Sequence, residues 1–82
     1  MRNVTSLNAP FIDGTETFSD NTTVTITADN VATIYYTLDG TDPTTASTVY
    51  TEPFTLSESA TVKAIAAYKT IVSPVASKVF NK

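Results

Sequence analysis

Cysteine, histidine and tryptophan are absent from this sequence, and glycine occurs only twice. Without cysteine there is neither a disulfide nor a thiol nucleophile, and without histidine the usual zinc ligands and a Ser-His-Asp arrangement are also missing. Two glycines cannot supply a phosphate-binding loop or a dinucleotide fingerprint. The sequence therefore predicts no catalytic residue, no cofactor and no metal centre, and the chain is not expected to be an enzyme.

Basic residues are also scarce. Five lysines and arginines stand against eight acidic residues, which gives a net charge of −3. Nucleic-acid binding needs clustered basic side chains, so nucleic acid is not an expected partner. No apolar run approaches the length of a membrane span, and membrane insertion is not expected. Low lysine content and abundant threonine favour a secreted or cell-surface location, with the export signal outside this sequence.

The length of 82 residues predicts one domain. We assign residues 1–8 to an N-terminal flank and residues 9–81 to the domain. A chain this short cannot surround a deep substrate cleft and keep a packed core as well, and we expect it to be a monomer in isolation.

Alternation of apolar and hydroxyl side chains is clearest in residues 23–28 and 33–38, as expected for half-buried strands. The same pattern continues at residues 54–56 and 61–68, although Ile65 interrupts it and leaves a short helix over residues 64–69 as the alternative. The inward positions predict a core made of Val24, Ile26, Ile34, Tyr36, Leu38, Phe54, Leu56, Val62 and Ala64.

About seven short strands, separated by turn signals every 8–12 residues, indicate an all-β fold. This spacing is typical of a two-sheet antiparallel sandwich or a small barrel.

A turn is predicted at Asp39, Gly40, Thr41, Asp42 and Pro43. Gly40 can take a positive φ, and Asp42 followed by Pro43 reads as a helix N-cap before one short helical turn over residues 43–46. Structural capping accounts for both aspartates. A calcium site built from Asp39 and Asp42 is the alternative, although two carboxylates are few ligands for that ion.

Tyrosines are the remaining binding feature. Tyr35 and Tyr68 are expected on a solvent-facing sheet surface, where they could form a small platform for a sugar ring or simply pack across strands. Tyr36 is expected in the core, and Tyr50 over the turn at residues 39–43.

Several segments resemble one bacterial domain family: Ala32–Pro43 (ATIYYTLDGTDP), Ser47–Tyr50, Pro53–Leu56 and Ala60–Ala66. Together they are similar to the chitobiase/β-hexosaminidase C-terminal-type domain. The resemblance implies an immunoglobulin-like or fibronectin-like sandwich that acts as a non-catalytic accessory module beside catalytic domains of secreted or surface glycosidases. At residues 68–72 this chain lacks the glycine-bearing turn of many members, so the last hairpin is expected to differ.

The resulting hypothesis is a spacer or interaction domain within a larger exported bacterial protein that acts on glycans. Its partners would be neighbouring domains of the same polypeptide. One alternative is a carbohydrate-binding module that holds polysaccharide through Tyr35. Another is a protein–protein adhesion module, for which a contiguous apolar patch on one sheet would be the sign.

Overall fold

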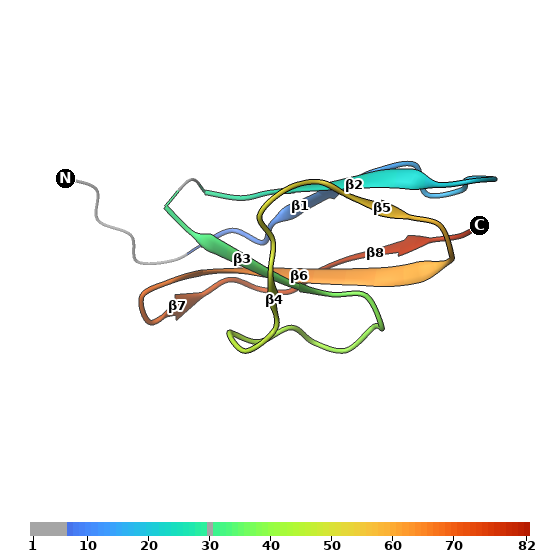
Figure 1. The fold of residues 1–82 in the computed structure, drawn as a ribbon. Helices are drawn as coiled ribbons and strands as arrows, with labels where there is room; N and C mark the ends of the chain where they lie inside the picture. Colours follow the sequence, from blue (N-terminus) through green and yellow to red (C-terminus); the bar gives the residue numbers. More distant parts are fainter. Residues whose placement is uncertain (1–6, 30) are drawn as a thin grey trace.

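The computed structural model describes residues 7–29 and 31–82. Its strands form two antiparallel sheets, so the prediction of an all-β sandwich is confirmed (Figure 1). No helix occurs among the described residues, and hence none that could cross a membrane. The strands are β1 (Phe11–Asp13), β2 (Thr22–Thr27), β3 (Thr33–Thr37), β4 (Thr48–Val49), β5 (Phe54–Leu56), β6 (Ala60–Tyr68), β7 (Ile71–Val72) and β8 (Ala76–Phe80).

One sheet has three strands in the order β1-β2-β5, and the other has five, in the order β4-β3-β6-β7 with β8 also paired to β6. β7 and β8 share one edge of β6 and are separated by residues 73–75. Ser73 bonds this break to β6: its backbone N–H donates to the Ala66 carbonyl at 2.8 Å, and its hydroxyl accepts from the Ala66 N–H at 2.9 Å. Pro74, which has no N–H to donate, lies in the break.

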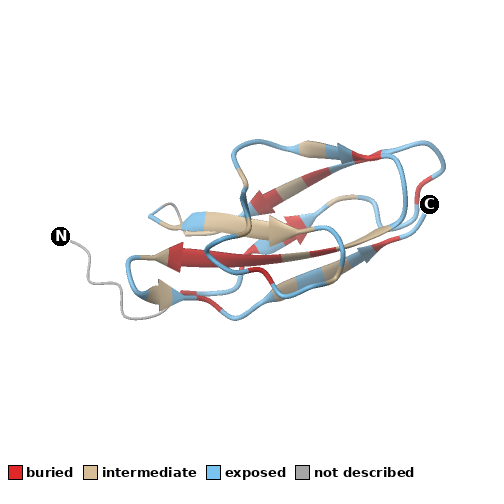
Figure 2. Ribbon diagram, turned by 60° about the horizontal axis from the view of Figure 1, so that its bottom comes forward, coloured by how far each residue is buried: buried red, intermediate tan, exposed pale blue. Residues whose placement is uncertain are grey.

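The core lies between the two sheets. Alternate residues of β2 point inward, and Val24 and Ile26 are buried. They face Val62 and Ala64 of β6, while Phe80 of β8 adds the largest fully buried side chain. Figure 2 shows that buried residues lie mainly on the strands and that most of the loop residues are exposed. Leu56 is buried as well, whereas Ile34, Tyr36 and Phe54 are partly buried and pack against this cluster.

Leu38 does not belong to the core, contrary to the prediction, because 41% of it is exposed. β3 ends at Thr37, so Leu38 lies beyond the regular backbone on which alternation depends.

β6 is buried on both faces, which explains the irregular pattern around Ile65. Directly opposite residues of antiparallel strands share a face, so Ile65 and its partner Tyr35 lie on the outer face of the five-stranded sheet. Ile65 is nevertheless only 2% exposed. The loop between β3 and β4 runs beneath this sheet in Figure 1. The helix considered for residues 64–69 is wrong, since β6 is a strand to Tyr68.

The hairpin between β6 and β7 turns through Lys69 and Thr70, with Tyr68 paired to Ile71. Lys69 has a φ of 56°, a conformation that suits glycine and strains residues with a Cβ atom. At the other end of the chain, Leu7 is buried although it lies before the boundary assigned at residue 9, which stays a prediction.

The two edges of the sandwich are closed differently. At the β1–β8 edge, Lys78 Nζ lies 3.1 Å from Glu16 Oε1, and Thr17 forms a parallel bridge with Asn81. Lys78 is opposite Val62 in register and therefore starts from the inner face of the sheet. We call this the charged edge. At the β3–β5 edge, three aromatic rings bridge the sheets.

Candidate functional site

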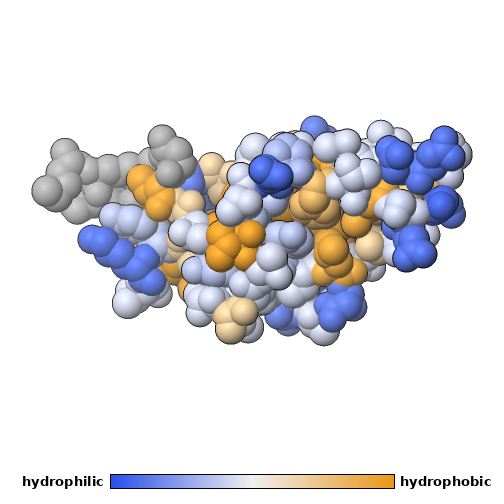
Figure 3. Space-filling view, in the orientation of Figure 1, coloured by the Kyte–Doolittle hydropathy of each residue, from blue (hydrophilic) through white to orange (hydrophobic). Residues whose placement is uncertain are grey.

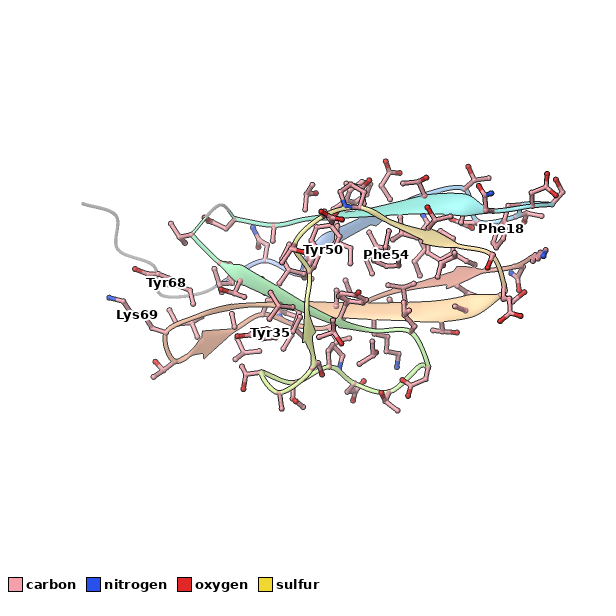
Figure 4. The ribbon with its side chains drawn as sticks, viewed as in Figure 1. Phe18, Tyr35, Tyr50, Phe54, Tyr68 and Lys69 are labelled. Carbon is pink, nitrogen blue, oxygen red and sulfur yellow. The ribbon has the colours of Figure 1, made fainter. Side chains whose placement is uncertain are left out.

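The two tyrosines predicted to form a platform do not lie together. Tyr35 shares the outer face of the five-stranded sheet with Ile65. Tyr68 has the opposite parity on β6, on the side of Ala64 and Ala66. Figure 4 shows Tyr68 beside Lys69 at the left end of the sheet, apart from Tyr35 near its middle. A joint platform is therefore wrong, and Lys69 Nζ already lies 5.3 Å from the centre of the Tyr68 ring.

Tyr36, Tyr50 and Phe54 form an aromatic cluster between the sheets. Tyr36 stacks on Phe54 with ring centroids 4.9 Å apart and planes inclined by 10°. Tyr50 meets both rings edge-on, each at 6.2 Å. These are the offset and T-shaped geometries that aromatic pairs favour. Tyr50 therefore closes the β3–β5 edge and does not cover the turn at residues 39–43, as the sequence had suggested.

The first half of that turn forms around Asp39. Asp39 Oδ1 accepts from the Thr41 hydroxyl at 2.6 Å and from the Thr41 N–H at 3.2 Å, and Gly40 between them has a φ of 81°. The hydroxyl first, and then the backbone N–H, lower the pKa of the Asp39 carboxyl below its ordinary value of 3.8. Asp39 is thus an ionised, oriented and exposed acceptor at neutral pH.

The predicted N-cap at Asp42 is wrong. Asp42 Oδ1 instead lies 3.4 Å from Lys63 Nζ on the outer face of β6, and the neighbouring Pro43 is buried. No helix follows, because residues 44–47 form a single turn closed by the Ser47 N–H and the Thr44 carbonyl at 2.9 Å. Thr44, two residues further on, makes the cap-like contact: its hydroxyl accepts from the Ala46 N–H at 3.1 Å.

The two aspartates therefore face different partners. Within residues 7–29 and 31–82, no three acidic, cysteine or histidine side chains gather where they could hold a metal ion.

A shallow hollow of about 420 Å³ lies beside the turn. None of its residues is among the predicted ligand contacts: Tyr36 and Leu38 are predicted in the core and Asp39 in the turn. The available signal was the position of Leu38, a large apolar residue directly before a turn. The lining consists of Tyr36, Thr37, Leu38, Asp39, Ala46, Ser47 and Thr48.

A second hollow of about 590 Å³ lies along the charged edge. Phe11 and Val79 line it and are exposed by 64% and 51%. The sequence gave no reason to single out either residue. Of the other exposed large apolar residues, Val31 lies on a loop. Val49 is opposite Tyr35 and Val72 is opposite Ala67, so these two valines lie on the outer face of the five-stranded sheet.

The sequence was compared with known protein families. The family described as "Fn3 associated" matches residues 24–80, more than half of the chain. The chain belongs to the Fn3-associated family. No curated protein matches the sequence. The family is one of fibronectin-like accessory modules, which agrees in its broad class with the resemblance noted from the sequence.

The Fn3-associated segment runs from within β2 to the end of β8. It therefore includes the complete five-stranded sheet, the aromatic cluster and the hollow beside Asp39. β1 and Glu16 lie outside it, so one partner of the charged edge comes from beyond the matched residues.

Proposed function

We propose that this Fn3-associated domain is a non-catalytic spacer and interaction domain of a larger secreted or surface bacterial protein that acts on glycans. Membership of an accessory family supports the non-catalytic role. The resemblance of residues 32–43 and 60–66 to chitobiase C-terminal-type domains supports the glycan-active host. The neighbouring domains of that host would be its partners.

The shape of the domain is the observation that carries this proposal. The molecule extends over 45 × 22 × 16 Å. In Figure 1 the described chain starts, in blue, towards the left side and ends, in red, at the right. A domain entered and left at different ends of its long axis adds its length between the segments joined to it. A flexible linker gives only a broad distribution of distances.

Spin labels on a double-cysteine variant, Asn8→Cys with Lys82→Cys, test the rigidity that spacing requires. Both positions are exposed, and the absence of native cysteine makes the labelling specific. We expect one narrow distance distribution by pulsed electron paramagnetic resonance in the folded protein, and a broad one for the same sample in urea. A broad distribution in the folded protein would contradict the spacer role.

A further inference from the structure

The hollow beside Asp39 combines apolar and polar groups within a small area. Leu38 and Ala46 contribute apolar surface and Tyr36 contributes an aromatic side chain. Ser47 and Thr48 contribute hydroxyl groups on the opposite strand and turn. The volume of about 420 Å³ lies within the range of small-molecule sites.

Leu38 is the apolar centre of this region. Leu38 lines the hollow beside Asp39 and two further hollows in its neighbourhood. One of these is also lined by Ala60 and Phe80, and the other by Leu56 and Glu58. Figure 3 shows apolar (orange) surface in the middle of this view, over the region of β3 to β5. An apolar side chain left in water at the meeting point of three hollows is suited to contact the apolar face of a ligand.

Asp39 supplies the polar end. Thr41 holds its Oδ1 atom through two hydrogen bonds, at 2.6 and 3.2 Å, so hydrogen bonds within the turn orient the carboxylate. Asp42, by contrast, contacts Lys63. Along the charged edge the main charges, Lys78 and Glu16, already contact each other at 3.1 Å. Among these groups, Asp39 is the charged acceptor that faces a hollow and has no basic neighbour paired to it.

We propose that the hollow formed by residues 36–39 and 46–48 binds a neutral saccharide unit. A pyranose ring presents C–H groups on one face, suited to Leu38, and hydroxyl donors at its rim, suited to the Asp39 carboxylate. Acidic saccharides are disfavoured because Asp39 and the net charge of −3 would repel them. This binding role goes beyond spacing and does not depend on it.

Amide chemical-shift titrations of the 82-residue domain test the proposal directly. The probes are cellohexaose and N,N′,N″-triacetylchitotriose, which are neutral, and trigalacturonate, which is anionic. We expect saturable shifts confined to residues 36–39 and 46–48 with at least one neutral probe, and weaker ones with trigalacturonate. Asp39→Asn keeps an oxygen for the turn and should weaken binding about tenfold through loss of a charge-assisted hydrogen bond.

Leu38→Ala should also weaken binding. Asp42→Asn, in the same loop but outside the hollow, and Val72→Ala, an exposed apolar residue of β7, are the matched controls and should bind like the unaltered domain. The spectrum of each free variant shows whether it is folded. Absence of shifts with both neutral probes, stronger binding of trigalacturonate, or binding abolished by Tyr35→Ala but retained by Asp39→Asn would overturn the proposal. None of these results bears on the distance test of the spacer role.

Discussion

Different interactions hold the two sheets together at the two edges of this sandwich. At the β3–β5 edge, three aromatic rings fill the space between the sheets at centroid distances of 4.9 to 6.2 Å. At the charged edge, residues 16–18, which follow β1, are joined to β8 by the ion pair with Lys78, and to Asn81 directly after β8 by two backbone hydrogen bonds, from the Phe18 N–H to the Asn81 carbonyl and from the Asn81 N–H to the Glu16 carbonyl. Aromatic packing is stabilised by burial and has no net charge for salt to screen, whereas a partly exposed ion pair contributes little and is screened.

The difference also bears on association. β8 is an edge strand of five residues, and such strands invite pairing with another chain. Lys78 is an inward-starting charge on that strand, which is one way in which proteins discourage such pairing. The β3–β5 edge has no such need of a charge against pairing. There the chain itself crosses from β4 to β5 through Tyr50 and covers the edge.

The largest effect should come from the aromatic cluster. Tyr36→Ala removes the ring stacked on Phe54 and leaves a gap, and we expect the free energy of unfolding to fall by about 3 kcal/mol. Tyr35→Ala, one residue earlier but on the outer face, should cost about 1 kcal/mol. Urea unfolding of both variants measures the difference, and equal losses would mean that the cluster does not hold this edge.

Gly14→Ala probes the close packing behind the charged edge. An added Cβ would lie 2.8 Å from Phe80 Cε1 and 3.1 Å from the Thr23 carbonyl oxygen, and Gly14 itself has a φ of 154°. We therefore expect a loss of about 2 kcal/mol from overpacking together with backbone strain. At Gly40 the same atom meets Thr61 Cβ at an ordinary 3.8 Å. Gly40→Ala should therefore cost about 1 kcal/mol, from backbone conformation alone. Thermal unfolding of the pair would count against this packing if Gly40→Ala proved the more harmful.

Glu16→Gln should have a smaller effect. It removes the charge opposite Lys78, and we expect a loss of about 0.5 kcal/mol at low ionic strength. Since surface pairs are screened, the difference from the unaltered protein should vanish near 1 M NaCl. Urea titrations at two salt concentrations measure it, and a difference that persists at high salt would require another explanation for this edge.

The smallest effect concerns Asp39, which belongs to neither edge. Its pKa is lower in the folded protein than the ordinary value of 3.8, so the fold favours the ionised form. Its contribution to stability is complete above that value and is lost as pH falls through the lower folded pKa. Below about pH 4, stability should therefore decline less steeply in Asp39→Asn than in the unaltered domain. Identical acid titrations of the two proteins would exclude this contribution.

The alternation of residues 23–28 was enough to predict β2 and its buried Val24 and Ile26, because a strand with one buried face imposes a period of two. The same rule failed at Leu38, where the regular backbone had ended. It does not predict the burial of Ile65 on the outer face, because burial there depends on parts of the fold beyond the strand itself.

Side-chain partners were the least predictable. Asp42 resembles an N-cap in sequence, yet Lys63, on another strand, takes its carboxylate. Parity alone separates Tyr35 from Tyr68, but only the register of β3 against β6 reveals that they face opposite sides. The hollow beside Asp39 is lined by residues 36–39 and 46–48, on the two sides of the loop between β3 and β4. The sequence predicts a helical turn over residues 43–46 of that loop, and therefore not this hollow.

Two double-mutant cycles, Tyr36 with Phe54 and Lys78 with Glu16, each measured at low and at high salt, test the central claim most directly. We predict a coupling free energy of about 1 kcal/mol for the aromatic pair that salt leaves unchanged. For the ion pair we predict about 0.5 kcal/mol at low salt and almost none at high salt. Salt-sensitive coupling of the rings, or ion-pair coupling that is the larger of the two at high salt, would contradict the view that the edges are held by different forces.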